Sequence, residues 1–166
     1  MTIKTLLDFI GEAESNGDYE IVWRGIKKQK HPAKLTDITV GEVLEWQEKM
    51  RKIGARSTAA GKYQIIYKTL QGTIRDAGVS LDDKFSPEAQ DKLAIALLKR
   101  RGLDTYIAGR ISAETFADRI AKEWASLPVV TGLRKGRSYY GGDGLNKSLV
   151  SVDAFLDAVR SVRAED

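Results

Sequence analysis

Glu14 is a candidate catalytic acid because of its position at the end of an expected helix. It follows a run of apolar residues at helical spacing and precedes the polar residues 15–19, SNGDY. A carboxylate at the C-terminal end of a helix faces the negative end of the helix dipole, which disfavours its charged form. Partial burial would act in the same direction, and a protonated carboxyl is what general-acid attack on a glycosidic oxygen requires. A solvated glutamate at a helix end is the alternative interpretation.

Residues 57–66, STAAGKYQII, form a second candidate, in which small residues precede an expected helix. Gly61 would let a backbone or a ligand approach closely. Tyr63 could offer the face of its ring to a sugar, and Gln64 could supply both a donor and an acceptor. The same pattern, taken alone, also fits tight packing between helices, so both interpretations stay open at this point.

Residues 137–144, RSYYGGDG, form a third candidate. Tyr139 and Tyr140 lie in a glycine-rich loop, which suits the wall of a cleft that stacks on a carbohydrate. A surface loop whose tyrosines point inward is the alternative. The glycines of this chain lack the preceding strand and following helix of a P-loop or a Rossmann fingerprint, so they do not indicate nucleotide binding.

Composition removes several other chemistries. The 166 residues include no cysteine, which excludes disulfides, cysteine-bound zinc, iron–sulfur clusters and thiol nucleophiles. The one histidine, His31, argues against a histidine-based metal site and against a Ser-His-Asp triad. Acid–base chemistry in this chain therefore falls to carboxylates.

The net charge is mildly positive. Lys and Arg total 27 against 23 Asp and Glu, and the resulting charge of +4 favours polyanions such as nucleic acid, acidic lipid and bacterial wall polymer. The basic residues 27–31, KKQKH, are the best argument for nucleic acid, but the run is short and has no periodic aromatic partner. We therefore interpret it as a solvated loop. No stretch approaches the roughly 20 apolar residues that cross a bilayer.

Helical spacing of apolar residues predicts the elements that must position these candidates. Expected helices cover residues 3–13 with a stop at Gly17, 40–50 behind a capping box from Thr39 to Glu42, 63–77, 87–102 behind Ser86, 113–124 behind Ser112, and 152–162. The alternation of Tyr19, Ile21 and Trp23 predicts a short strand. The sequence thus predicts an α+β fold, mostly α, as a single domain over residues 1–166 with a small β element near the N-terminus.

The order and spacing of these motifs resemble the lambda-type phage endolysins, which are lysozyme-fold lytic transglycosylases of the bacterial cell wall. The shared motifs are Glu14-Ser-Asn16-Gly17, residues 19–22 (YEIV), His31-Pro32, residues 57–64 (STAAGKYQ), residues 85–91 (FSPEAQD) and residues 124–128 (WASLP). The resemblance covers most of the chain, and fewer residues match beyond Pro128. There, the loop with the two tyrosines resembles a broader set of phage and prophage lysozyme-like proteins.

The resemblance implies a lysozyme-like fold, peptidoglycan glycan strands as the substrate, and no metal or organic cofactor. The family's single catalytic glutamate falls on Glu14. Substrate binding falls on Ser57, Gly61, Tyr63 and Gln64 in the cleft motif and, by their place in a late loop, on Tyr139 and Tyr140.

The implied reaction needs one carboxylate. Protonated Glu14 would donate to the oxygen that links N-acetylmuramic acid to N-acetylglucosamine. As a carboxylate it would then deprotonate the muramic acid 6-hydroxyl, which attacks the anomeric carbon and leaves a 1,6-anhydro end. No water would be consumed.

Two alternatives remain open. A hydrolysing muramidase would need a second carboxylate to position water, and the candidates are Asp18, Glu20 and Asp37, with Glu20 first among them. A non-catalytic module that binds wall glycan or nucleic acid would belong to a different class of protein.

The N-terminal segment carries Asp8, Glu12 and Glu14, which do not suit a secretory signal. We therefore expect synthesis in the host cytoplasm, followed by holin-type release to the periplasmic wall or by transport in the virion. We also expect a monomer that neither binds nucleic acid nor inserts into a membrane.

Overall fold

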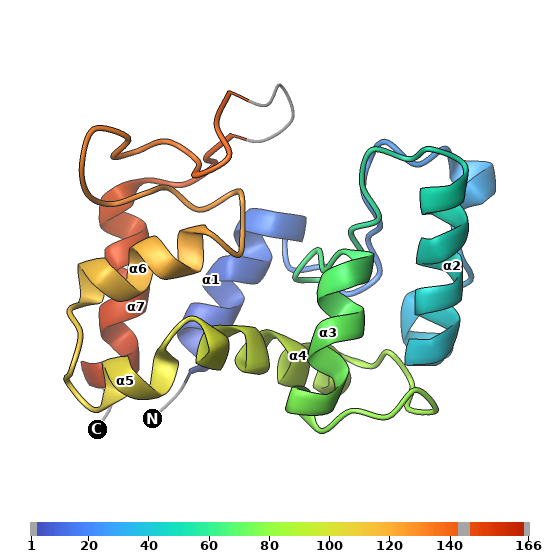
Figure 1. Ribbon diagram of the computed structural model, residues 1–166, viewed down its shortest axis with the longest axis horizontal. Helices are drawn as coiled ribbons and strands as arrows, with labels where there is room; N and C mark the ends of the chain where they lie inside the picture. Colours follow the sequence, from blue (N-terminus) through green and yellow to red (C-terminus); the bar gives the residue numbers. More distant parts are fainter. Residues whose placement is uncertain (1–2, 143–146, 165–166) are drawn as a thin grey trace. The chain divides into compact units, whose positions relative to one another are not determined.

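The structure of the protein is a computed structural model that describes residues 3–142 and 147–164. Its helices are α1 (Lys4–Ser15), α2 (Val40–Lys52), α3 (Tyr67–Ala77), α4 (Pro87–Arg100), α5 (Leu103–Ile107), α6 (Ala113–Ala121) and α7 (Val152–Ala164), with short 3-10 turns at η1 (Lys28–Lys30) and η2 (Leu35–Asp37) (Figure 1). Within the described ranges, none of these helices is long and apolar enough to span a bilayer.

The chain divides into two compact units. The first comprises Met1–Glu14 and Leu97–Asp166, and the second comprises Ser15–Ala96. The helix α4 contributes residues to both. The prediction of a single domain over residues 1–166 stays a prediction, and each unit is described below by itself.

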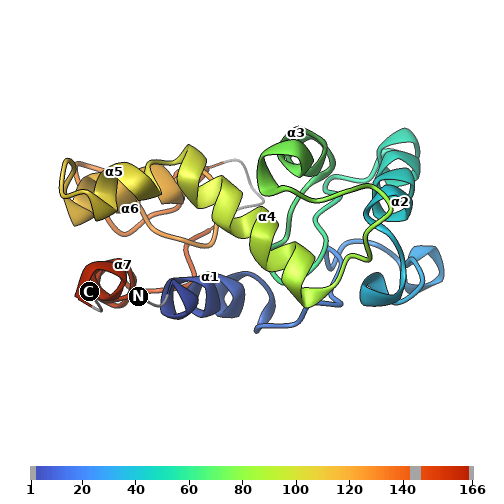
Figure 2. The same cartoon turned by 90° about the horizontal axis from the view of Figure 1, so that it is seen from below.

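The first unit is built on α1, α5, α6 and α7. Leu6 and Ile10 recur at helical spacing on α1 and are fully buried. The ring of Phe9 on α1 lies parallel to that of Phe155 on α7, with 6.1 Å between their centroids. Figure 2 shows these two helices side by side. The ring of Tyr106 on α5 stacks on Phe116 of α6 at 4.9 Å, which joins the helices around one apolar core.

The predicted end of α1 is confirmed. The helix ends at Ser15, and the next two residues, Asn16 and Gly17, have positive φ values of 53° and 76°. Glycine adopts this left-handed conformation without steric cost, which is why the helix stops here. Glu14 is therefore the second-last residue of α1.

The second unit contains α2 and α3. The predicted capping box of α2 is confirmed: Thr39 Oγ1 accepts from Glu42 N at 3.1 Å, and Glu42 Oε1 accepts from Thr39 N at 3.1 Å. Ser86 caps α4 as predicted, because its Oγ accepts from Ala89 N at 3.1 Å.

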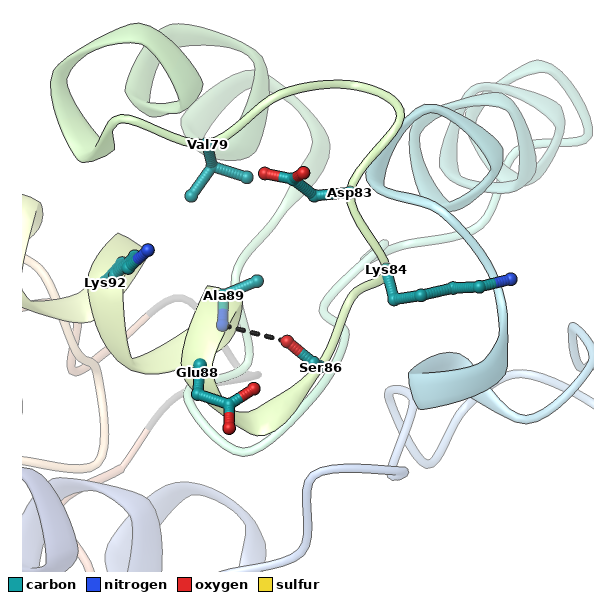
Figure 3. A pocket seen from close by; sticks show the side chains of 7 residues that line it. All are labelled: Val79, Asp83, Lys84, Ser86, Glu88, Ala89 and Lys92. Carbon is teal, nitrogen blue, oxygen red and sulfur yellow. Dashed lines mark hydrogen bonds between the residues drawn. The ribbon is translucent and has the colours of Figure 1, made fainter.

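A cavity of about 260 Å³ lies beside this N-terminal end of α4 in the second unit (Figure 3). It is lined by Val79, Asp83, Lys84, Ser86, Glu88, Ala89 and Lys92. None of the site residues expected from the sequence lines it, so this cavity is separate from the candidate chemistry.

The small β element is not confirmed, because the described residues show isolated bridges in place of a strand. Val22 bridges Ala60, and Ala60 bridges Ile65. Trp23 N donates to Ala59 O at 2.9 Å, and Gly61 N donates to Ile21 O at 2.7 Å. The partner segment turns back at Gly61, whose φ is 80°, so the ladder cannot lengthen.

The helix predicted over residues 63–77 begins later, at Tyr67. Gln64 has a φ of 46°, which lies outside the helical region, and Ile66 occupies the N-cap position. The helix predicted over residues 113–124 starts behind its Ser112 cap as expected but ends at Ala121. The sequence patterns located these helices and misplaced one end of each.

Candidate active site

Glu14 is held by one residue from a distant part of the chain. Its Oε1 accepts from Ser126 Oγ at 2.5 Å and from Ser126 N at 3.3 Å. Ser126 is buried and belongs to the segment that follows α6, where its carbonyl accepts from Leu149 N at 2.9 Å. Both residues lie in the first unit, so the carboxyl group has a defined orientation at the end of α1.

The environment of Glu14 favours its protonated form. Burial raises the pKa of the carboxyl above its ordinary value, and the two hydrogen bonds from Ser126 offset this only in part. The sequence analysis gave this direction as one interpretation, with a solvated glutamate at a helix end as the other. A carboxyl in this state can donate a proton at a pH where an exposed glutamate is fully ionised.

Tyr139 and Tyr140 form a pair in the same unit. Their rings meet edge to face with 5.1 Å between centroids, and each residue is 41% exposed. Tyr140 Oη donates to Lys122 O at 2.5 Å, which fixes that ring. The pair follows Ser138, which bridges Pro128, two residues beyond Ser126. The two rings are therefore partly open to solvent, as the cleft-wall interpretation requires; Asp143 and Gly144 of the same motif lie outside the described residues.

The Gly61 motif lies in the second unit and is a tightly packed turn. A Cβ on Gly61 would come within 2.3 Å of Gln90 Oε1. The same oxygen accepts from Lys62 N at 2.9 Å, and Gln90 Nε2 donates to Phe85 O at 3.0 Å and to Tyr19 O at 3.1 Å. Gln90 belongs to residues 85–91, so two motifs of the resemblance meet in this one contact.

We expect Gly61→Ala to destabilise the second unit by roughly 1–3 kcal/mol, because alanine at positive φ is strained and its methyl group would displace Gln90. Gly54→Ala is the matched control, since Gly54 has a φ of 84° and nothing within 4 Å of its added Cβ. Urea denaturation of both variants would separate the strain from the clash. Equal losses of stability in the two variants would contradict a role for the contact with Gln90.

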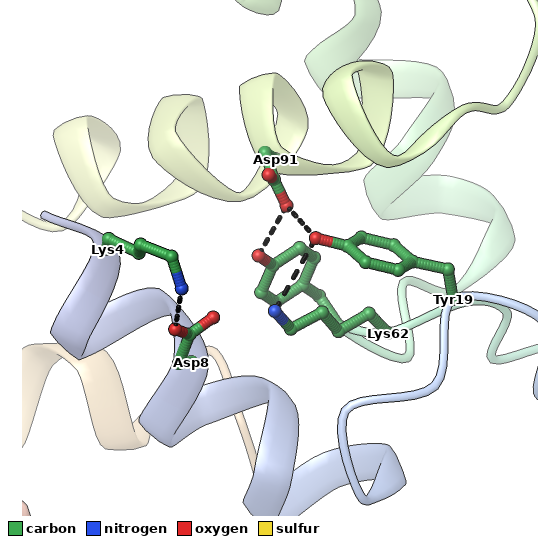
Figure 4. Close-up of polar contacts among 6 residues, drawn as sticks. Lys4, Asp8, Tyr19, Lys62 and Asp91 are labelled. Atoms are coloured by element: carbon green, nitrogen blue, oxygen red, sulfur yellow. Dashed lines mark hydrogen bonds and ion pairs between the residues drawn. The ribbon is translucent and has the colours of Figure 1, made fainter.

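Tyr63 is packed inside the second unit. It is 1% exposed, and its hydroxyl donates to Asp91 Oδ1 at 2.6 Å. Tyr19 Oη donates to the same oxygen at 2.9 Å, and Lys62 Nζ lies 4.9 Å from the centroid of the Tyr19 ring (Figure 4). Burial and the Asp91 carboxylate raise the pKa of Tyr63, which keeps it neutral. These contacts favour the packing interpretation of Tyr63 over stacking on a sugar.

Gln64 and Ser57 support the same turn. Gln64 Nε2 donates to Gly61 O at 2.9 Å and to Ile21 O at 3.1 Å, which holds the side chain across the turn. Ser57 Oγ accepts from Ala59 N at 3.2 Å. Both side chains are partly exposed, unlike that of Tyr63.

The carboxylates weighed for hydrolysis lie in the second unit. Glu20 accepts from Thr36 with both oxygens, from the backbone N at 2.8 Å and from Oγ1 at 2.9 Å. Asp18 Oδ1 accepts from Glu20 N at 2.8 Å. Asp37 accepts from Lys84 Nζ through its backbone carbonyl at 2.8 Å. The Glu20 carboxylate is thus engaged in fixing η2.

The site residues expected from the sequence divide between the two units: Glu14, Tyr139 and Tyr140 lie in the first, and Ser57, Gly61, Tyr63 and Gln64 lie in the second. The structure brings Glu14 together with Ser126, which the sequence did not single out as a functional residue. Its only signal was its place in residues 124–128, WASLP, as the polar side chain of a mostly apolar run. No group of three His, Asp or Glu side chains that could hold a metal ion occurs in residues 3–142 and 147–164.

Comparison with known proteins assigns the family. The family model described as Endolysin matches residues 29–147, which is more than half of the chain. The chain belongs to the endolysin family. The matched range contains the Gly61 motif, Ser126 and both tyrosines, whereas Glu14 lies before it.

Two curated relatives agree with this endolysin assignment. The endolysin of Escherichia phage P2 is 45% identical over 76 residues, which cover 45% of this chain and 43% of that protein. The endolysin of Escherichia phage lambda is 29% identical over 137 residues, which cover 78% of each chain. The match thus spans less than half of the P2 endolysin and more than two thirds of the lambda endolysin.

A solved structure confirms the fold. Bacteriophage lambda lysozyme, complexed with a chitohexasaccharide, matches with a TM-score of 0.53 and 21% identity, covering 96% of this chain and 92% of that one. The predicted lysozyme-like, mostly helical fold and the resemblance to lambda-type endolysins are confirmed. Family and fold together support a cell-wall-degrading function for this endolysin.

Proposed function

We propose that this endolysin is a lytic transglycosylase that cleaves the bond between N-acetylmuramic acid and N-acetylglucosamine in peptidoglycan, with Glu14 as its acid–base residue. The observation that carries the proposal is the partly buried Glu14 carboxyl, whose pKa is raised by burial and whose orientation is fixed by Ser126. The family assignment and the saccharide bound to the lambda lysozyme support a glycan substrate.

Glu14 would act first as an acid and then as a base. Its proton passes to the glycosidic oxygen as the bond to the anomeric carbon of muramic acid breaks. The resulting carboxylate takes the proton of the muramic acid 6-hydroxyl, whose oxygen bonds to the same anomeric carbon. The proton lost in the first step is regained in the second, so one carboxyl completes the cycle and no water is consumed.

Ser126 would position Glu14 through Oε1. Because both donors of Ser126 point to Oε1, the other oxygen, Oε2, is the one that carries the exchangeable proton in this proposal. A carboxyl held in one orientation donates along one direction, which lowers the entropy lost on reaching the transition state.

The proposed substrate contacts differ in kind. The half-exposed rings of Tyr139 and Tyr140 would stack on sugar rings of the glycan, and the partly exposed Ser57 and Gln64 would hydrogen-bond to it. Gly61 and Tyr63 would act by holding the shape of the turn that carries Gln64. We further propose that the protein acts as a monomer on the periplasmic wall, after holin-type release or from the virion, without cofactor, nucleic acid or insertion into a membrane.

Mass spectrometry of the soluble fragments released from purified sacculi tests the proposal. A transglycosylase yields fragments that end in 1,6-anhydromuramic acid. Reducing ends that carry one additional water would overturn the proposal, favour a muramidase and direct attention to Glu20, Asp18 and Asp37. The absence of fragments from folded protein would leave a non-catalytic wall-binding module.

A further inference from the structure

Two exposed cations lie beside the tyrosine pair of the first unit, and two more are exposed on the segment that leads to it. Lys122, Arg134, Lys135 and Arg137, called the cationic patch below, are all exposed. Lys122 Nζ lies 5.6 Å and the Arg134 guanidinium carbon 5.8 Å from the centroid of the Tyr139 ring. The patch therefore combines positive charge with a partly exposed aromatic surface.

The segment that carries the patch has a fixed backbone. Arg134 Nη2 donates to Ser138 O and to Gly141 O, each at 3.2 Å. Val129 N donates to Arg137 O at 2.7 Å, and Gly136 N donates to Val129 O at 2.8 Å. These bonds present the cations from an ordered loop, which reduces the entropy that a ligand would have to remove.

Two acids near Lys122 in the sequence, Glu123 and Asp118, are engaged by other partners. Glu123 is 9% exposed in its side chain and pairs with Arg101 at 2.7 Å. Asp118 Oδ1 accepts from Val130 N at 2.7 Å, and its Oδ2 accepts from Thr131 Oγ1. Residues 124–142 contain no Asp or Glu, and the next acid along the chain, Asp143, lies outside the described residues. In the described part of the chain, no ion pair joins a cation of the patch to a carboxylate.

A cationic patch is not what the sugar rings of a glycan require, because these rings are uncharged. The peptide attached to the lactyl group of muramic acid, however, carries carboxylates. Arginine and lysine beside an aromatic surface suit a chain that presents carboxylates next to a sugar. Three of its cations, Arg134, Lys135 and Arg137, follow Ser126, the partner of Glu14, along the chain of the first unit.

We propose that the cationic patch binds the carboxylates of the peptide stems on the glycan strand, so that the endolysin prefers stem-bearing peptidoglycan to uncharged glycan. This inference rests on the proposed function, since it names the substrate feature that the same unit recognises. It assigns the tyrosine pair to the sugar and the four cations to the peptide attached to it.

The test measures binding without cleavage. Glu14→Gln protein is sedimented with native sacculi and with sacculi whose carboxyls have been converted to amides by carbodiimide and ammonia. One exposed pair of opposite charges strengthens binding by a factor of roughly two to five. Because the patch can form more than one such pair, we expect binding to the amidated wall to be about tenfold weaker. Amidation removes carboxylates and leaves phosphates, so it distinguishes these two anions. It also leaves the protein unchanged, so this arm does not depend on the folding of a further variant.

A charge variant identifies the residues. In the Glu14→Gln background, the triple change Lys122→Gln, Lys135→Gln and Arg137→Gln keeps Arg134 for the loop and should lose about tenfold in binding to native sacculi and most of its sensitivity to amidation. The matched control, Lys27→Gln, Lys28→Gln and Lys30→Gln, removes the same charge from the basic turn of the second unit and should behave as its parent.

Three outcomes would overturn the inference: equal binding to native and amidated walls, no loss of binding in the patch variant, or an equal loss in the control. These outcomes are distinct from failure of the proposed function. A wild-type protein that releases no anhydro fragments would remove the transglycosylase proposal, whereas the preference for carboxylates is read from binding alone.

Discussion

Replacing Glu14 by glutamine should reduce the release of soluble fragments from sacculi by a factor of about 10²–10⁴, the usual contribution of a general acid. Glutamine has nearly the same shape, and its amide oxygen can still accept from Ser126. The variant therefore removes the exchangeable proton while keeping the position of the side chain. Turnover measured by fragment release, with folding followed by circular dichroism, gives the result directly.

Glu12→Gln is the control for this variant, because Glu12 is an exposed residue of the same helix two positions earlier. Side chains two positions apart point to different faces of a helix, so Glu12→Gln should leave turnover near the wild-type level. A folded Glu14→Gln protein that retained a large part of the wild-type turnover would exclude Glu14 as the acid and leave the muramidase carboxylates or a binding module.

The Glu14→Gln variant should also be more stable than the wild type at neutral pH. Because burial raises the pKa of Glu14 in the folded state, the folded protein binds a proton more tightly than the unfolded chain does. Stability from this group is therefore full below the pKa of the unfolded carboxyl and is lost as the pH rises through the raised folded value. Glutamine does not titrate, so the difference in Tm between Glu14→Gln and wild type should widen as the pH rises. A difference that stays constant with pH would contradict the raised pKa.

The fold could be predicted where local residues decide it. The Thr39 capping box, the Ser86 and Ser112 caps and the stop at Gly17 each depend on a few neighbouring residues, and the structure has all four. The β element could not be predicted in the same way, because it depends on how residues 21–23 meet residues 59–61. A strand of alternating residues needs a partner of equal length, and the turn at Gly61 shortens that partner.

The candidate site shows the same difference between features set by neighbouring residues and features set by distant ones. The raised pKa of Glu14 follows from its burial, and the sequence indicated this direction only as one of two interpretations, beside a solvated glutamate at a helix end. Ser126, which orients the carboxyl, lies 112 residues away, and nothing local marks a serine as the partner of a distant acid. The two uses of Tyr63 that the sequence left open, sugar stacking and packing, differ only in burial, which depends on Asp91 and Tyr19 from elsewhere in the second unit.

Replacing Ser126 by alanine should move the alkaline fall of activity to a higher pH. The two hydrogen bonds from Ser126 stabilise the charged form of Glu14, and the variant removes the shorter of them, from Oγ. The pKa of Glu14 should therefore rise further, so that the protonated acid persists to a higher pH. Turnover at the optimum should also fall by roughly tenfold or more, because the carboxyl loses its fixed orientation. The rate of fragment release measured across a pH series gives both results.

Ser126→Thr separates positioning from packing, because threonine keeps a hydroxyl at the same place and should restore the alkaline limb of the pH profile. The carboxyl carbon of labelled Glu14, followed by NMR against pH, reads the titration without reference to activity. An unchanged titration in Ser126→Ala would show that burial alone sets the pKa. Burial by itself would favour an acid that gives up its proton reluctantly, and the hydroxyl of Ser126 opposes that tendency by stabilising the carboxylate. A residue that must act first as an acid and then as a base needs both forms within reach, and the pairing of burial with one strong donor provides that balance.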